Sequence, residues 1–248
     1  YIIANTSFIR FLTMKNIQLL VFIFLVGTLS LMAQEPNNLY PLEAKIKYHT
    51  DWTKNHYVVR LNEFSSDPAK EGDIIFIGDS ITEGGKAWSS KFNRNDIKNR
   101  GISGDVTDGV ITRLGEIFYF KPKAVFIMIG VNDLFNLHYQ KEIPSPEYVG
   151  NNVLTIIEQI NEKSPKTEIY LQTLLPTHED FMNENILKVN TMLRQQKGAR
   201  NYILIDLNAS FKNENGFLKK EFTYDGVHLN EKGYNHWVEI LKPIISSI

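Results

Sequence analysis

Short apolar runs alternate along the chain with longer stretches in which apolar residues recur at helical spacing. The runs are rich in β-branched residues and apolar on both faces, as central strands of a parallel sheet require. They lie at 74–77, 97–99, 124–129, 169–173 and 203–205, with 97–99 the weakest. Alternation of this kind predicts β-α units around a parallel sheet.

The stretches between the runs predict helices that would cover both faces of the sheet. Helical apolar spacing covers 107–118, 147–162 and 183–196, and Asn230 is placed to cap a last helix that runs to about residue 245. The fold class that follows is α/β, in a three-layer α/β/α arrangement. Before the first run, apolar residues at helical spacing predict a packing helix of little functional interest; they are Trp52, Tyr57, Val58 and Leu61.

The first 33 residues have the pattern of a targeting segment. They contain Arg10 and Lys15 but no acidic residue, and 17–32 is largely apolar. With Met14 as the start, this pattern predicts a signal peptide cleaved after Ala33. The alternative is an uncleaved anchor, because the apolar stretch approaches the length that spans a bilayer. We expect an exported protein, periplasmic or secreted, with no stable membrane insertion after cleavage.

Domain organisation follows from these boundaries. We expect an N-terminal extension and signal peptide at 1–33, a helical segment at 34–72 that packs on the domain, and one main domain at 73–248. A hydrophobic content of 43% in 248 residues supports one large core.

Composition excludes several classes of function. A formal net charge of −1 gives no electrostatic reason to bind nucleic acid. The absence of cysteine removes disulfides, thiolate zinc sites, iron–sulfur clusters and a cysteine nucleophile. The six histidines show no H-x-H or H-E-x-x-H spacing, so we expect no metal site.

Ligands of open parallel sheets bind beyond the carboxyl ends of the strands, so the residues after each predicted strand carry the functional information. Ser80 follows the first strand in the sequence Gly-Asp-Ser-Ile-Thr, where its hydroxyl can face the crevice as a nucleophile. The alternative is that Ser80 only caps the next helix. Thr82 stands where the nucleophile elbow of α/β-hydrolases has its second glycine, which excludes that architecture.

Three further strand ends or turns complete a candidate site. Gly104 lies in a loop after the second strand, where its N–H can face a ligand, and Asn132 follows the third strand with a side-chain amide donor. Asp225 precedes His228 by three residues, so one turn can hold the imidazole against the carboxylate. Each signal alone also fits an ordinary loop, an Asx turn or an Asp-Gly turn. Together they supply a nucleophile, a base, an orienting acid and oxyanion donors.

On these blocks the chain resembles the SGNH (GDSL) hydrolase family, whose signature Ser, Gly, Asn and His match Ser80, Gly104, Asn132 and His228. The branch that it looks most similar to contains platelet-activating factor acetylhydrolase catalytic subunits and bacterial acetylesterases. The resemblance implies a flavodoxin-like five-stranded sheet, esterase activity on small acyl groups and no cofactor, with the hydrolase domain at 73–248.

The expected reaction is ester hydrolysis through an acyl-enzyme. Ser80, His228 and Asp225 would form the catalytic triad, and the oxyanion hole would consist of the N–H groups of Ser80 and Gly104 and the amide of Asn132. The expected substrate is a small-molecule or glycan ester, with an acetyl group on a carbohydrate favoured.

Three alternatives stay open at this point: hydrolysis of longer acyl chains by a lysophospholipase or thioesterase, acyl transfer to a sugar hydroxyl, and a silent glycan-binding module. The loops expected after Asn132 and after Pro176 would form the pocket walls. Possible substrate contacts are Asp79 and, in these loops, Phe135, His138 and His178. The oligomeric state does not follow from the sequence.

Overall fold

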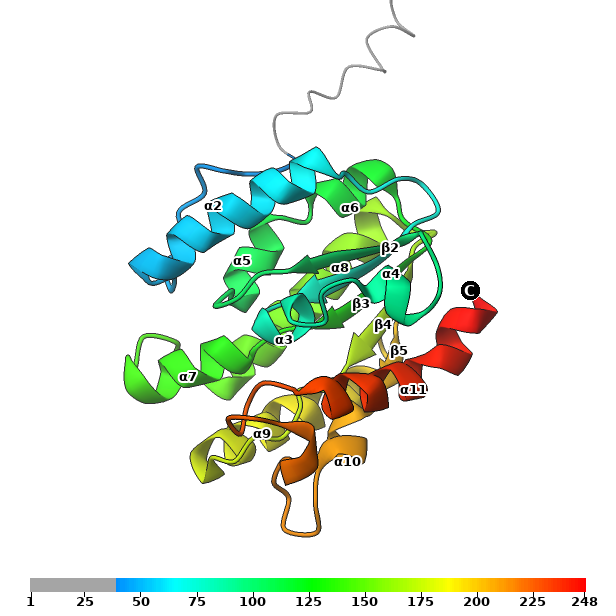
Figure 1. Ribbon diagram of the computed structural model, residues 1–248. Helices are drawn as coiled ribbons and strands as arrows, with labels where there is room; N and C mark the ends of the chain where they lie inside the picture. Colours follow the sequence, from blue (N-terminus) through cyan, green and yellow to red (C-terminus); the bar gives the residue numbers. More distant parts are fainter. Residues whose placement is uncertain (1–38) are drawn as a thin grey trace, which may run out of the picture. The chain divides into compact units, whose positions relative to one another are not determined.

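The structure is a computed structural model that describes residues 39–248. The predicted start at Met14 and signal peptide at 1–33 lie outside the described residues and stay predictions. The described part contains a five-stranded parallel sheet with helices on both faces, as predicted (Figure 1).

The sheet has the strand order β2-β1-β3-β4-β5, which places β1 and β3 at its centre. The strands are β1 (Ile74–Gly78), β2 (Ile97–Gly101), β3 (Ala124–Met128), β4 (Glu168–Gln172) and β5 (Ile203–Ile205). Every residue of β1 and β3 is buried, which explains why these two strands gave the clearest apolar runs. The predicted strands are all present, and their ends shift by at most two residues.

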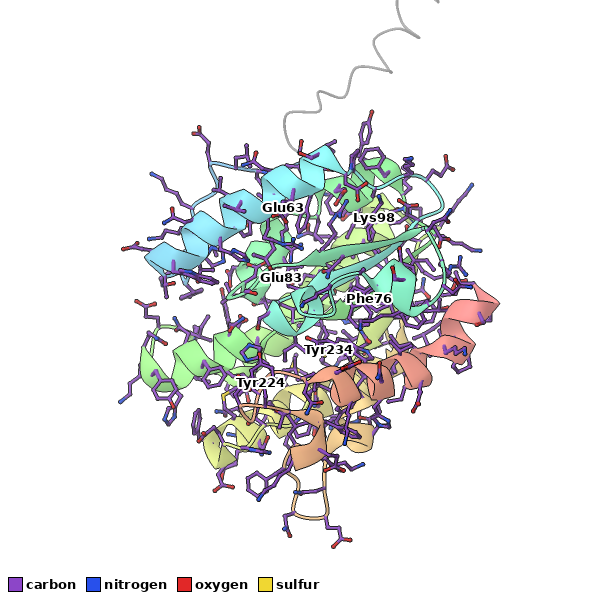
Figure 2. The ribbon with its side chains drawn as sticks, in the orientation of Figure 1. Glu63, Phe76, Glu83, Lys98, Tyr224 and Tyr234 are labelled. Atoms are coloured by element: carbon purple, nitrogen blue, oxygen red, sulfur yellow. The ribbon has the colours of Figure 1, made fainter. Side chains whose placement is uncertain are left out.

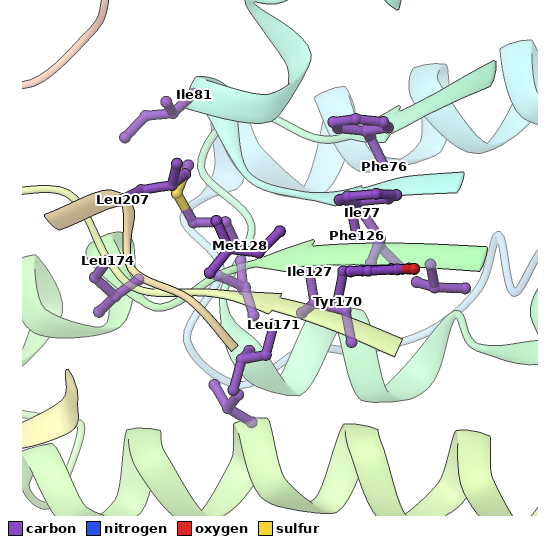
Figure 3. Close-up of a cluster of buried hydrophobic side chains, with 14 of the residues drawn as sticks. Phe76, Ile77, Ile81, Phe126, Ile127, Met128, Tyr170, Leu171, Leu174 and Leu207 are labelled. Carbon is purple, nitrogen blue, oxygen red and sulfur yellow. The ribbon is translucent and has the colours of Figure 1, made fainter. Parts of the chain in front are cut away.

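One face of the sheet carries a ladder of aromatic rings. Phe76, Phe126 and Tyr170 occupy paired positions on β1, β3 and β4, and their rings stack at 4.8 and 4.5 Å between centroids (Figure 3). Trp88 stacks on Phe76 at 4.6 Å, and Trp237 packs edge-on against Trp88. These tryptophans belong to α4 (Trp88–Lys91) and α11 (Glu231–Ser247), so both helices cover this face.

The remaining helices connect the strands, and those that neighbour α8 cover the other face. Helix α8 neighbours α5, α6 and α9 and lies behind the sheet in the view of Figure 1. Their bounds are α3 (Ser80–Glu83), α5 (Thr107–Thr112), α6 (Gly115–Phe120), α7 (Val131–Tyr139), α8 (Pro146–Lys163), α9 (Asp180–Gln196), α10 (Leu207–Phe211) and a 3₁₀ turn, η2 (Lys220–Phe222). The predicted cap of α11 is confirmed, because the Asn230 side chain accepts from the N–H of Gly233.

Two helix predictions were wrong in detail. The single helix expected at 107–118 is two short helices that break at Arg113 and Leu114, where the Arg113 side chain turns inward to buried acceptors. The loop expected after Asn132 is helix α7. Its buried face includes Asp133 and Asn136, so a hydrophobic pattern does not reveal it.

Helix α2 (Asp51–Ser66) forms the predicted N-terminal helix, and it has a small core of its own. Tyr57, Leu61 and Phe64 pack there with Ile102 of the loop after β2. Trp52 was wrongly expected to pack in this core, since its side chain is 61% exposed and stacks on His56. The contacts of α2 with the loop after β2 bring it into the candidate site.

Candidate active site

Ser80 stands directly beyond the end of β1. Asp79 caps helix α3, and its side chain accepts a hydrogen bond from the N–H of Ile81 at 3.0 Å, so Ser80 becomes the first residue of the helix. The sharp turn requires Gly78, because a Cβ there would lie 2.2 Å from the carbonyl oxygen of Met128. This local structure fixes the Ser80 backbone while its side chain stays half-buried.

Asp79 itself does not suit the substrate contact expected from the sequence. Its side chain is 1% exposed, and burial raises the pKa of its carboxyl to about 7, against the hydrogen bond from Ile81. A buried carboxyl that accepts from its own helix supports the turn on which Ser80 sits. Asp79 is therefore a supporting residue of the nucleophile turn.

The structure brings Ser80, His228 and Asp225 together from opposite ends of the described chain. The Oγ of Ser80 lies 3.0 Å from Nε2 of His228, and Nδ1 of the same ring lies 2.7 Å from Oδ2 of Asp225. Because an ionised carboxylate only accepts, Nδ1 carries the proton and Nε2 of the neutral ring faces Ser80 as an acceptor.

The loop that holds His228 is closed by its own backbone. Oδ1 of Asp225 accepts from the N–H groups of Val227 and His228, and the Thr223 hydroxyl donates to the carbonyl of His228 at 2.6 Å. Partial burial acts to raise the pKa of Asp225, but the hydrogen bonds from His228 and the backbone hold that pKa below its usual range. The carboxylate therefore stays ionised beside the imidazole.

Gly104 adopts a conformation that suits glycine. Its φ is +79°, and a Cβ there would lie 2.7 Å from the hydroxyl oxygen of Thr53 on α2. The next residue, Asp105, accepts a hydrogen bond on its carbonyl oxygen from the Asn132 side chain at 2.9 Å. The loop after β2 and the start of α7 are thus joined, and Asn132 keeps its second N–H for another acceptor.

A buried ion network holds this loop from behind. Asp105 is fully buried; it accepts from Arg113 at 2.9 Å and lies 3.0 Å from Nε2 of His49. The same Arg113 guanidinium donates to the carbonyl oxygens of Gly78 and Arg100, at the ends of β1 and β2. One side chain therefore ties the Gly104 loop to the strand that leads to Ser80.

Helix α2 adds a second set of contacts to this loop, which the expectation of a packing helix of little functional interest did not include. Glu83 accepts from the N–H and the hydroxyl of Ser103, and His56 of α2 lies 3.0 Å from the same carboxylate. Arg60 donates to the carbonyl of Gly101 at 3.1 Å. We call the contacts of His49, Thr53, His56 and Arg60 with this loop and Glu83 the α2 brace.

The residues of the α2 brace form a pattern in the sequence, but the pattern is polar, so an analysis of hydrophobic periodicity does not detect it. Thr53, His56 and Arg60 are spaced by three and four residues, which places them on one side of α2, and His49 lies two residues before that helix begins at Asp51. A polar stripe at this spacing indicates a helix face that binds a polar loop.

A cavity of about 510 Å³ opens beside Ser80 and His228. Tyr224, from the loop before α11, and Tyr234, from α11, line it, and Figure 2 labels both. The rest of its lining is Gly84, Gly85, Lys86, Lys91, Leu229, Asn230 and Glu231. A larger indentation of about 530 Å³ lies outside β2, away from the Ser80 hydroxyl.

Three side chains expected at the substrate do not line this cavity. Phe135 and His138 belong to an aromatic cluster of α7 with Phe181, in which His138 stacks on Phe181 at 3.7 Å. His178 donates from Nε2 to the carbonyl oxygen of Leu218 at 2.9 Å and lies against Gly226, so it supports the Asp225–His228 loop from outside. Nothing in these contacts brings the three side chains to Ser80.

Residues 39–248 contain no cluster of acidic, histidine or cysteine side chains arranged to hold a metal ion. Within the same residues, no helix has the length and apolar character needed to cross a membrane. The chemistry available at the site is that of a hydroxyl beside a hydrogen-bonded imidazole and carboxylate, with amide donors nearby, which is the arrangement of an acyl-transfer site.

Comparison with known proteins agrees with this geometry. Residues 76–236 match the GDSL-like Lipase/Acylhydrolase family. The human platelet-activating factor acetylhydrolase IB subunit alpha2 is 29% identical over 202 residues, which cover 78% of this chain and 81% of that protein.

Solved structures share the fold. A Streptococcus pneumonia protein provisionally described as a platelet activating factor is 28% identical and superimposes with a TM-score of 0.67, covering 79% of this chain and 95% of the other. The acetylxylan esterase Axe2 of Geobacillus stearothermophilus is 20% identical and superimposes with a TM-score of 0.60, covering 71% of this chain and 95% of the other. At this identity, the similarity shows the fold alone. The chain belongs to the GDSL-like lipase/acylhydrolase family and is a carboxylic ester hydrolase.

Proposed function

We propose that the protein is a serine esterase that hydrolyses short acyl esters, with acetyl as the acyl group and a sugar as the alcohol. One observation carries the proposal: the continuous hydrogen-bonded chain from Ser80 Oγ to His228 Nε2 at 3.0 Å and from His228 Nδ1 to Asp225 Oδ2 at 2.7 Å. A serine hydroxyl becomes a useful nucleophile when a neighbouring base accepts its proton as it attacks.

In the first half of the reaction, Ser80 Oγ forms a bond to the ester carbonyl carbon and its proton moves to His228 Nε2. The carbonyl π electrons move to oxygen, which becomes an oxyanion. When the tetrahedral intermediate collapses, the bond to the alcohol oxygen breaks and His228 returns the proton to that oxygen. Asp225 stabilises the imidazolium that forms in between and holds the ring in place.

In the second half, water replaces Ser80 as the nucleophile. His228 accepts a proton from the water as its oxygen attacks the acyl carbon, and then gives that proton to Ser80 Oγ as the acid leaves. The N–H groups of Ser80 and Gly104 and the side chain of Asn132 are the proposed donors to the oxyanion. Such donors accelerate the reaction because they bind more strongly as negative charge develops.

The acyl group and the alcohol are inferred from relatives. An acetylhydrolase subunit and an acetylxylan esterase stand among the similar proteins, and both names specify acetyl esters. The basic and apolar pattern of residues 1–33 supports export, which would give access to acetylated glycans outside the cell.

The test is hydrolysis of p-nitrophenyl esters from acetate to palmitate by the purified protein and by Ser80→Ala. We expect the highest kcat/KM at acetate and a loss of at least about 10⁴-fold in kcat for Ser80→Ala. Ser90→Ala, an exposed serine on α4, is the matched control and should retain full activity.

Other outcomes would contradict the proposal in different ways. Equal rates for wild type and Ser80→Ala would remove Ser80 as the nucleophile. A rate that peaks at long acyl chains would point to a lysophospholipase or thioesterase, and acylated sugar in place of free acetate would point to a transferase.

A further inference from the structure

We propose that the cavity beside His228 binds the alcohol half of the substrate and that its preferred alcohol is an acidic sugar, a pyranose ring that carries a carboxylate. The inference rests on the proposed esterase function and names its substrate class. It is carried by an exposed aromatic ring and two unpaired lysines that share one cavity with Ser80.

The position of His228 determines which half of the ester occupies this cavity. His228 must give its proton to the alcohol oxygen as that group leaves, so the alcohol lies on the imidazole side of the reacting carbon. The cavity is lined by Ser80 and His228, whereas Gly104 and Asn132 are not among its lining residues. It therefore lies on the alcohol side, and Gly104 and Asn132, two of the three proposed oxyanion donors, lie outside it.

Tyr224 provides a flat apolar surface in the cavity. Its side chain is 72% exposed, and its ring lies nearly parallel to the His228 ring, with 6.0 Å between centroids and 12° between planes. Thr223 and Leu229 form an isolated β-bridge that closes the loop on either side. An exposed aromatic ring on a braced loop loses little freedom when it binds, and its π-face attracts the C–H groups of a sugar ring.

Two lysines give the cavity a positive charge. Lys91 Nζ lies 5.6 Å from the centroid of the Tyr234 ring, and Lys86 lines the same wall. Among the described residues, neither ammonium is ion-paired with a carboxylate. Glu231 is the one acidic side chain in the lining, so the cavity carries a net positive charge and favours an anionic ligand.

The lining also disfavours an alcohol half that carries a long hydrocarbon chain. Leu229 has the one aliphatic side chain in the lining, and it is only 3% exposed. Lysine and glutamate side chains would lose hydration against a hydrocarbon chain without compensating hydrogen bonds. The same groups can donate to and accept from sugar hydroxyls, and a volume of about 510 Å³ is within the usual range for small-ligand pockets.

The test compares two acetyl esters that differ in one group. Methyl galactopyranoside and methyl galactopyranosiduronate, acetylated at the same hydroxyl, are incubated with the full-length protein, and acetate release is measured. At about 10 mM ionic strength we expect kcat/KM to be roughly tenfold higher for the uronate, and we expect the preference to shrink at about 0.5 M salt.

Variants identify the residues responsible. Lys86→Gln combined with Lys91→Gln should remove the preference for the uronate, whereas Lys242→Gln, an exposed lysine further along α11, should leave it unchanged. Tyr224→Ala should lower kcat/KM for both sugar esters about fivefold relative to ethyl acetate, whose alcohol has no ring. Tyr139→Ala, which removes a tyrosine of 61% exposure on α7, should keep that ratio.

The outcomes separate this inference from the function on which it rests. If wild type and Ser80→Ala release acetate equally slowly from every ester, the esterase proposal fails. If wild type hydrolyses ethyl acetate but shows no preference for the uronate, or if the lysine and tyrosine variants keep the wild-type ratios, only the acidic-sugar inference is overturned. Faster release from an acetylated glycerophospholipid than from either sugar would also overturn it.

Discussion

Ser80 lies between two regions that are built in opposite ways. On one side, the Gly104 loop is held by Asp105 and Arg113, whose side chains are 0% and 2% exposed and ion-paired at 2.9 Å. On the other side, the loop that carries Asp225 and His228 leaves these side chains 39% and 36% exposed. One region is buried and fully paired, and the other is open to solvent.

The difference matches the demands of the proposed chemistry. Oxyanion donors are effective only if they are fixed before charge develops, because reorganisation during the reaction would consume the energy gained. The alcohol side must admit and release different molecules, so it can remain open. The buried, rigid region therefore serves the acyl-transfer step that all substrates share. The exposed cavity around Tyr224 serves substrate preference.

Arg113→Met should have the largest effect on stability, because it disrupts the buried region. It would leave the Asp105 carboxylate buried without its main partner, and breaking such a pair costs about 3–5 kcal/mol in the free energy of unfolding. Urea denaturation measures the change. Arg194→Met removes the exposed pair with Asp206 and should cost at most about 1 kcal/mol. Equal costs for the two variants would refute the contrast between buried and exposed pairs.

Asn132→Ala should weaken catalysis with a smaller effect on stability. If its side chain donates to the oxyanion, its loss lowers kcat by about 10²–10³-fold, with KM for p-nitrophenyl acetate nearly unchanged. Asn151→Ala on α8, an exposed asparagine, is the control. A change in KM alone would show that Asn132 binds substrate without stabilising the transition state.

Asp133→Asn should sharpen the comparison through its dependence on pH. Burial raises the pKa of Asp133 to about 8 from the ordinary value of 3.8, against hydrogen bonds from Thr107. The folded protein keeps this proton while the unfolded chain releases it above pH 3.8. The stability contributed by the neutral carboxyl is therefore complete below that pH and is lost as the pH rises to about 8.

Asparagine cannot ionise, so the Tm of Asp133→Asn relative to wild type should increase between pH 5 and pH 8. Differential scanning calorimetry at the two pH values measures this change. Asp51→Asn, at a side chain that is 97% exposed, should show no such trend. A constant Tm difference for Asp133→Asn would mean that Asp133 is ionised in the folded protein throughout this range.

Much of the fold could be predicted because its signals are local. The strands at the sheet centre are continuous apolar runs, and the Asn230 cap is a single side chain that accepts from an N–H three residues later. Helix α7 escaped prediction because its buried face is partly polar, with Asp133 bonded to Thr107 of another element. A polar residue at a buried position cannot be recognised until its partner is known.

The candidate site divides in the same way. Ser80, Gly104 and Asn132 follow predicted strands, so the rule for parallel sheets predicts them at one edge of the sheet. The structure joins Ser80 to His228 at 3.0 Å. The predicted contacts Phe135, His138 and His178 were chosen from loops, and the structure places them outside the cavity beside Ser80.

By itself, the sequence determined the α/β class and the order of the strands along the chain, and it predicted the residues of the proposed chemistry, because strand periodicity and short motifs depend on neighbours along the chain. Only the tertiary structure decided what surrounds those residues. The α2 brace joins Asp105 to His49, 56 residues away, and the cavity joins Lys86 to Tyr224. Such contacts arise from packing between distant segments, which local spacing does not encode.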